Sequence, residues 1–104
     1  MQFINLTPHD ITVIVDGKTI VFPKTDKVAR CKTATTHVNN IDGIPIYATR
    51  FGDVMDLPPM EEGKLVIVSA LVKDREYTRH DLVSPGNLLR NADGVVVGCQ
   101  GFNI

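Results

Sequence analysis

Three Asp-Gly pairs, each flanked by β-branched residues, constrain this 104-residue chain more than any other feature of its sequence. Asp16-Gly17 separates ITVIV from KTIVF, Asp42-Gly43 precedes IPIY, and Asp93-Gly94 separates NLLRNA from VVVGCQGF. Asp-Gly favours the type I′ turn, whose central residues both adopt positive φ and which joins adjacent antiparallel strands. The pairs therefore predict β-hairpins and a mainly β fold.

The segments between these turns predict further strands. VARCKTATT (28–36) alternates small or apolar residues with charged ones, and GIPIYATRF (43–51) is also extended in character. Pro45 in the second segment favours an edge strand or the start of a strand, because proline has no N–H to donate. LVIV (65–68) is a continuous apolar run, typical of a central strand covered on both faces.

The segment that follows LVIV is where a helix fits. Residues 69–82 read SALVKDREYTRHDL, with Ser69 as the N-cap. Pro85-Gly86 is predicted to end this segment and to turn the chain into the last hairpin. Residues 1–104 are thus expected to form a single globular α+β domain, mainly β, with an antiparallel or mixed sheet of about six or seven short strands and one short helix after a central strand.

Composition limits the class of protein. The formal net charge is −1, whereas proteins that bind long nucleic acids usually carry a clear basic excess. No apolar run approaches the roughly 20 residues of a membrane-spanning helix, and MQFINLTPHD does not have the pattern of a secretion signal. We therefore expect a cytoplasmic protein that binds neither long nucleic acid nor membrane.

A metal site is one alternative, built from His9-Asp10, His37 and His80-Asp81. Imidazole and carboxylate ligands would have to converge on one ion and leave a position open for water. Neighbouring residues of a strand point to opposite faces, however, and Asp10 stands in a turn context where it can bond local backbone. The sequence therefore predicts no metal and no other cofactor.

Nucleophilic catalysis is a second alternative, through Cys31, Cys99, Ser69 or Ser84. Neither serine has the glycine pattern of a nucleophile elbow. Cys99 lies in VVVGCQGF, which has the character of a strand with a bulge or a close backbone approach. The two cysteines are expected to be free thiols in a reducing compartment. No catalytic residue is predicted, and the chain is not expected to be an enzyme.

Arginines concentrate after LVIV, and they predict a site for a small anionic, nucleotide-like ligand. Arginine binds phosphate in a bidentate fashion and stacks on flat bases, and an exposed tyrosine can add an aromatic platform. An aspartate can accept a hydrogen bond from ribose or orient an arginine. The predicted ligand-binding residues are Ser69, Arg75, Tyr77, Arg79, Asp81, Ser84 and Arg90.

Two features favour contact with proteins instead. The connection DVMDLPPMEEG (53–63) carries Met55, Leu57 and Met60 among acidic residues, and methionines can serve adaptable recognition. A short β-rich chain also leaves strand edges that symmetric pairing can cover, so a homo-oligomer is expected.

Seven motifs, in order, extend over nearly the whole chain: INLTPHDITV, ARC, IDGIPI, FGDVMDLP, IVSALV, DLVSPGNLLRN and GVVVGCQG. Together they resemble a family of small, mostly uncharacterised proteins encoded by tailed phages, prophages and some actinobacterial chromosomes. Where family members have a variable or acidic residue after an arginine, this chain has His80, which argues against a His-Asp metal site.

The resemblance implies an accessory counter-defence factor. Such factors sequester a nucleotide-derived immune signal or block a host protein. The leading prediction is therefore a non-enzymatic protein that sequesters a small phosphate-bearing signal molecule in the host cytoplasm. The alternatives are an inhibitor or virion accessory factor that binds a host protein, and, third, a nucleotide-degrading hydrolase.

Overall fold

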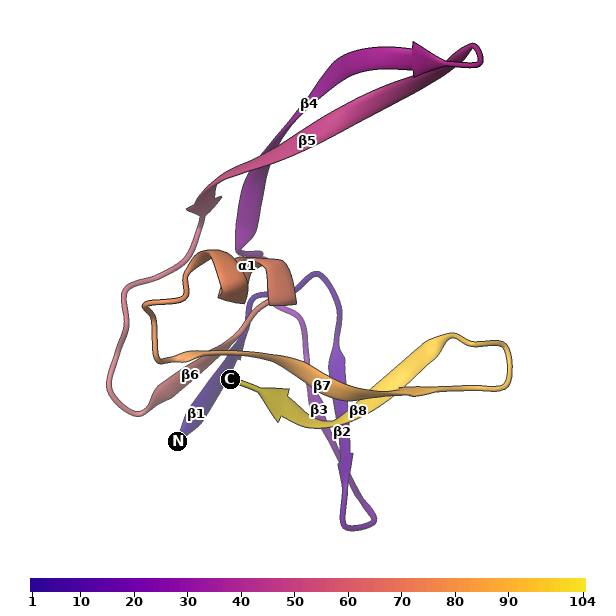
Figure 1. Cartoon of the computed structure of the whole chain (residues 1–104). Coiled ribbons are helices and arrows are strands. Elements are labelled where there is room, and N and C mark those ends of the chain that lie inside the picture. Colours follow the sequence, from indigo (N-terminus) through magenta and orange to yellow (C-terminus); the bar gives the residue numbers. More distant parts are fainter.

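The computed structural model describes all 104 residues and contains eight β-strands and one short α-helix (Figure 1). In chain order these are β1 (Gln2–Asn5), β2 (Ile11–Val15), β3 (Lys18–Phe22), β4 (Arg30–Ile41), β5 (Ile44–Met55), β6 (Lys64–Ile67), α1 (Ala70–Arg75), β7 (Leu82–Arg90) and β8 (Val96–Asn103). Six strands form one mixed sheet and β4–β5 forms a separate hairpin. The expected fold class is confirmed, with eight strands rather than six or seven.

The six-stranded sheet has the order β1-β6-β7-β8-β2-β3. β6 runs parallel to β1 and β7, whereas β7–β8 and β2–β3 are antiparallel pairs. The sheet curls so that its end strands approach, and the Asn5 side chain in β1 donates to the Phe22 carbonyl in β3 at 2.8 Å. The rings of Phe3, Phe22 and Phe102 lie 5.0 to 5.7 Å apart between centroids. This aromatic cluster stabilises the curl, since such pairs contribute about 0.5–1.5 kcal/mol each beyond buried area.

Two of the three predicted Asp-Gly turns have the expected geometry. Asp16 and Gly17 have φ of 50° and 73°, and Asp42 and Gly43 have φ of 52° and 78°. Positive φ at both central residues is the property that makes Asp-Gly suitable for a two-residue hairpin turn. The third hairpin, β7–β8, also forms, but through a longer loop in which the Asn91 side chain accepts hydrogen bonds from two backbone N–H groups.

The core gathers around β6, which lies between β1 and β7. Val66, Ile67 and Val68 are buried, as expected for a central strand, and Val72 of α1 packs into one cluster with Val66 and Val68. Ser69 caps the helix as predicted, because its hydroxyl accepts the Val72 N–H at 3.3 Å. The sequence LVIV followed by a capped turn thus builds the largest part of the buried core.

Beyond this core the molecule is open. Only 16 of 104 residues are buried, and the Cα radius of gyration is 16.6 Å, against about 13 Å for a compact domain of this length. The extents are 51 × 39 × 23 Å. Three hairpins project from the body and account for this shape (Figure 1).

The largest projection is the β4–β5 hairpin, residues 30–55, which we call the arm. Each strand has 12 residues, and neither pairs with the main sheet. Pro45 lies near the start of β5, as expected. At the base of the arm, the Gly52 carbonyl accepts hydrogen bonds from Arg75 Nη2 at 3.2 Å and from Cys31 Sγ at 3.3 Å. The arm is therefore attached to the body at its base and is otherwise free.

The prediction that Pro85-Gly86 turns the chain was wrong. Both residues lie inside β7 and pair with Phe102 and Gly101 of β8. β7 pairs with β6 only through Leu82 and Val83. From Pro85 onward, the edge of β7 on the β6 side has no strand beside it, so no backbone N–H is needed there. Proline is tolerated in a strand under this condition.

Candidate functional site

Arg79 and Asp81, two of the predicted ligand-binding residues, bind each other. Arg79 donates from Nε to Asp81 Oδ1 and from Nη2 to Oδ2, both at 2.7 Å, and Nη2 also donates to the Pro58 carbonyl at 3.0 Å. Asp81 is only 5% exposed. Hydrogen bonding to Arg79 lowers the pKa of Asp81 below its ordinary value, and the same contact raises the pKa of Arg79. This pair ties the connection between β5 and β6 to the start of β7.

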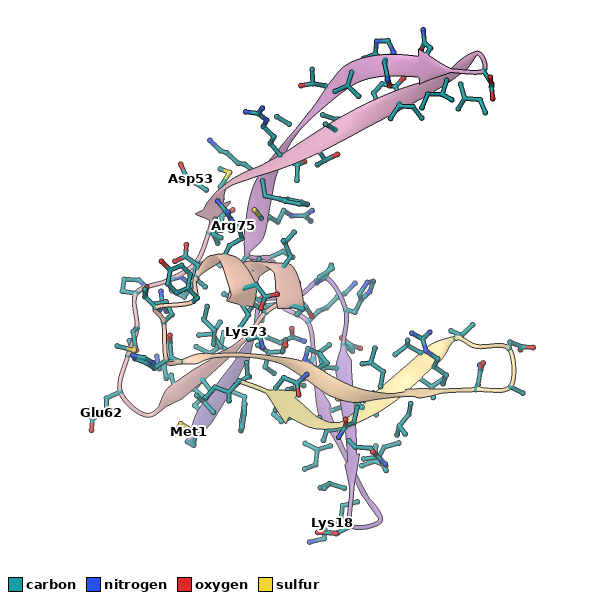
Figure 2. All side chains as sticks on the ribbon, in the orientation of Figure 1. Met1, Lys18, Asp53, Glu62, Lys73 and Arg75 are labelled. Carbon is teal, nitrogen blue, oxygen red and sulfur yellow. The ribbon has the colours of Figure 1, made fainter.

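The other two predicted arginines also bond to backbone, in separate places. Arg75 reaches from α1 toward the base of the arm (Figure 2), where it contacts the Gly52 carbonyl. Arg90 donates from Nη1 to the Gly94 carbonyl at 2.9 Å, within the β7–β8 loop. The three arginines lie on different elements, and the structure does not bring them together around one ligand.

The remaining predicted residues divide between surface and core. Ser69 is exposed with its hydroxyl engaged in the helix cap, whereas Ser84 is buried within β7 at 2% exposure. Tyr77 is 82% exposed on the turn after α1. Ser69, Arg75 and Tyr77 therefore share α1 and its flanks, and Arg79 and Asp81 follow along the same connection.

The residues considered for metal binding and nucleophilic catalysis do not form a centre. No group of three or more His, Cys, Asp or Glu side chains lies close enough to hold a metal ion. Asp10 accepts the Lys24 backbone N–H at 2.8 Å, and His37 on the arm bonds to Asn40. Cys31 and Cys99 are free thiols. In addition, no helix is both long and apolar enough to cross a membrane.

The connection between β5 and β6 places its apolar side chains in two environments. Leu57 packs against the core cluster, whereas Met55 and Met60 are exposed. Residues 53–55 belong to β5, so the connection begins at Asp56. The two methionines are therefore exposed at the surface, whereas Leu57 contributes to the core.

Sequence reasoning missed the outer half of the arm, residues 37–48, which we call the tip. Its sequence is HVNNIDGIPIYA, in which Asp42 is the only Asp, Glu, Lys or Arg. All twelve residues are exposed, and side chains stand on both faces of the arm with no other part of the chain against them (Figure 2). The exposed large apolar residues of the tip are Val38, Ile41, Ile44, Ile46 and Tyr47. The signal in the sequence was an apolar segment almost without charge on both sides of a hairpin turn.

Strand pairing divides these side chains between the two faces of the tip. Ile41 pairs with Ile44, and Ile46 follows two residues later, so these three share one face. Tyr47 pairs with His37 on the opposite face, and their rings lie 5.6 Å apart. The tip therefore presents an isoleucine face and an aromatic face.

A second apolar surface lies where β2 and β8 separate. A hollow of about 400 Å³ is lined by His9, Asp10, Ile11, Thr12, Pro85, Leu88, Val95, Val96, Val97, Gly98 and Cys99. It is open to solvent, and most of its wall is aliphatic. None of the seven predicted ligand-binding residues lines it.

Both surfaces present mainly apolar side chains to solvent. Comparison of the chain with protein-family models, with curated proteins and with solved structures found no match.

Proposed function

We propose that this chain is a non-catalytic protein-binding factor whose recognition element is the tip of the arm. The observation that carries this proposal is an exposed apolar segment with a single Asp, Glu, Lys or Arg, held away from the body on the outer half of the arm. The cores of protein interfaces are depleted of charge and enriched in aromatic and apolar side chains. A monomer gains nothing from presenting such a surface to water.

The geometry of the arm defines the chemistry of a suitable partner. β4 and β5 pair only with each other, so each has one edge with unpaired backbone N–H and C=O groups. A partner that adds a strand to either edge satisfies these groups, and the isoleucine or aromatic face fills its apolar pockets. We therefore propose a partner with an extended segment or an open sheet edge beside an apolar groove.

The biological setting is taken from the sequence resemblance to phage and prophage proteins. In that setting the partner is a host protein in the host cytoplasm, and binding blocks its activity. This matches the inhibitor alternative raised from the sequence.

A photo-crosslinking amino acid placed at position 44 tests the proposal in host cells. Ile44 is 62% exposed at the tip, and Met60, 57% exposed on the β5–β6 connection, is the matched control position. We expect one discrete host protein to crosslink from position 44 and not from position 60. Ile44→Asp with Tyr47→Ala is expected to weaken capture at least about tenfold, since apolar and aromatic anchors carry most interface energy.

The double variant Ile44→Asp with Tyr47→Ala also distinguishes a loss of binding from a loss of folding. Ile44 and Tyr47 are exposed, so their replacement is expected to leave the unfolding midpoint within a degree or two of the wild type (about 0.5 kcal/mol). No adduct from position 44, or an adduct with the mass of two copies of this chain, would contradict the proposal.

Sequestration of a small phosphate-bearing, nucleotide-derived signal is the second candidate. The observation that favours it is the Tyr77 ring, 82% exposed at the end of the helix that carries Lys73 and Arg75 in its last turn. An exposed aromatic ring near the end of a helix that carries two cations suits a stacked base with a phosphate. Asp74 and Glu76 on the same segment reduce the local positive charge.

Calorimetric titration with ADP-ribose and with cyclic nucleotides tests this second candidate. We expect saturable heat that Tyr77→Ala weakens about tenfold or more, because stacking of a base on an aromatic ring contributes about 1–3 kcal/mol. Tyr47→Ala removes the other exposed tyrosine ring, 60% exposed on the arm, and is the control. Absence of heat for the wild type, or equal loss in both variants, would eliminate this candidate.

A further inference from the structure

The hollow of about 400 Å³ between β2 and β8 has the size and the lining of a small-molecule site. The two strands are parallel and pair at one register position, Val13 with Cys99, and the residues that line the hollow precede this pair on both strands. The hollow is therefore a wedge, closed at Cys99, which is 1% exposed, and open at Val95, which is 57% exposed. Sites for small molecules measure about 300–1,000 Å³ and are lined by apolar side chains with a few polar groups.

At the closed end of the wedge, β2 lies close against the backbone of β8. A Cβ at position 98 would lie 3.2 Å from the Thr12 carbonyl oxygen, so only glycine fits there without displacement. Cys99 donates from Sγ to the same carbonyl at 3.5 Å. The rest of the wall includes four exposed aliphatic side chains, those of Leu88, Val95, Val96 and Val97. A ligand with an apolar body would remove these side chains from water, which favours binding.

Asp10 gives the hollow its charge. It is the one Asp, Glu, Lys or Arg in the wall. Its Oδ1 accepts the Lys24 backbone N–H at 2.8 Å, and neither of the two ion pairs in the structure involves its carboxylate. The hollow therefore combines an aliphatic wall with a carboxylate that has no cation paired to it. This combination favours a cationic ligand and disfavours an anionic one.

The backbone beside this carboxylate is fixed by buried side chains. The His9 carbonyl accepts hydrogen bonds from the Asn5 amide at 2.9 Å and from the Thr7 hydroxyl at 3.0 Å, and both of these residues are buried. Together with the bond from Lys24, these contacts hold Asp10 in place before a ligand arrives. A site that is ordered in advance loses less conformational freedom on binding.

We infer that the hollow binds a small organic ammonium ion, whose charged nitrogen pairs with Asp10 and whose aliphatic or aromatic body lies against the valine wall. An ammonium group donates charge-assisted hydrogen bonds to a carboxylate, and these are stronger than hydrogen bonds between neutral groups. The charge of this ligand is opposite to that of the nucleotide-like anion predicted from the sequence. The hollow lies in the six-stranded sheet and the arm is a separate hairpin, so the inference does not depend on the function proposed for the arm.

NMR titration of the backbone amides of the full chain with three probes tests the inference. Cyclohexylmethylamine carries both the charge and the body, cyclohexanecarboxylate has the opposite charge, and methylamine has no body. We expect cyclohexylmethylamine to shift the amides of residues 95–99 saturably, with a dissociation constant of about 1 mM or lower, as suits a ligand with so few atoms. The other two probes are expected to bind at least about tenfold more weakly, because each lacks one of the two contacts.

Two variants with matched controls assign the site. Asp10→Asn keeps an oxygen that can accept the Lys24 N–H but removes the charge, so it is expected to weaken binding of cyclohexylmethylamine about tenfold. Asp74→Asn, which changes an exposed carboxylate on α1, is expected to bind as the wild type does. Val97→Lys places a cation in the wall and is expected to abolish binding, whereas Met60→Lys, at a similarly exposed position on the β5–β6 connection, leaves it unchanged.

Three results would overturn the inference. One is the absence of saturable shifts with cyclohexylmethylamine at about 10 mM, well above the expected dissociation constant. The second is equal affinity for cyclohexanecarboxylate, and the third is wild-type affinity in both Asp10→Asn and Val97→Lys. Amide spectra that match the wild type outside residues 9–12 and 95–99 would show that the variants are folded. None of these results bears on crosslinking from position 44, so failure here and failure of the function proposed for the arm are distinguishable.

Discussion

Replacement of Asp81 by alanine is expected to lower the free energy of unfolding by about 3–5 kcal/mol, because it leaves the Arg79 guanidinium without its carboxylate in a largely buried position. Side-chain exposures of 20% for Arg79 and 6% for Asp81 leave little solvent to replace the lost contact. The variant also removes the carboxylate that orients the Arg79 guanidinium, whose Nη2 donates to the Pro58 carbonyl. Urea unfolding followed by circular dichroism at one fixed protein concentration measures the change.

Glu61→Ala is the matched control for this prediction. Glu61 forms an ion pair with Lys64 at 2.6 Å, but the two side chains are 58% and 35% exposed. Exposed pairs contribute about 0–1 kcal/mol, so this variant is expected to unfold almost as the wild type does. Equal effects of Asp81→Ala and Glu61→Ala would contradict the structural role assigned to the Arg79–Asp81 pair.

The Arg79–Asp81 pair also makes the stability of the fold depend on pH. The pKa of Asp81 is lowered in the folded chain from an ordinary value of 3.8, so folding favours its ionised form. Its contribution to stability is complete above the pH at which the unfolded carboxyl ionises, and it is lost as the pH falls from about 4 through the lowered pKa. The stability difference between wild type and Asp81→Ala is therefore expected to be constant near neutrality and to shrink in acid.

Asn5→Ala is expected to lower the free energy of unfolding by about 3 kcal/mol, since removal of one partner leaves several buried polar groups unsatisfied. The Asn5 amide donates to the His9 and Phe22 carbonyls, and its oxygen accepts from the N–H and the hydroxyl of Thr7. Asn5 and Thr7 are both buried. A single side chain thus fixes the turn after β1 and joins the two ends of the curled sheet.

Hydrogen exchange can locate this effect as well as measure it. Asn5→Ala is expected to speed amide exchange in β3 more than in β6, because the bond to Phe22 holds β3 near β1. Asn40→Ala on the arm removes an amide that bonds only to the exposed His37 side chain, and it serves as the control with an expected change below about 0.5 kcal/mol. Uniform acceleration across β3 and β6 would argue against a local link.

Local structure was predictable where a few neighbouring residues determine it. Asp16-Gly17 and Asp42-Gly43 specify their turns through positive φ, and Ser69 specifies the helix start through its hydroxyl. The order of the strands was not predictable in this way. β1 lies beside β6, and β2 contacts β8, and such parallel pairings join distant segments that carry no matching local signal.

The contacts of the predicted site residues were likewise not predictable from the local sequence. Arg79 was expected to hold a ligand, but in the fold its strongest donors face Asp81, two residues further along the chain. Sequence shows that an arginine is present but not which acceptor lies within reach of it. The tip was missed for the opposite reason: Ile44 and Ile46 have the composition of core residues, and only the fold shows that nothing covers them.

The topology of the main sheet also determines the order in which parts of the molecule can form. The arm is a local hairpin, and hairpins close in about 1–10 μs. The contact of β2 with β8 joins Val13 to Cys99, so the sheet must close a loop that spans most of the chain. Chains dominated by such distant contacts fold in milliseconds to seconds. The arm is therefore expected to be structured, with its apolar tip exposed, while the body that carries it is still folding.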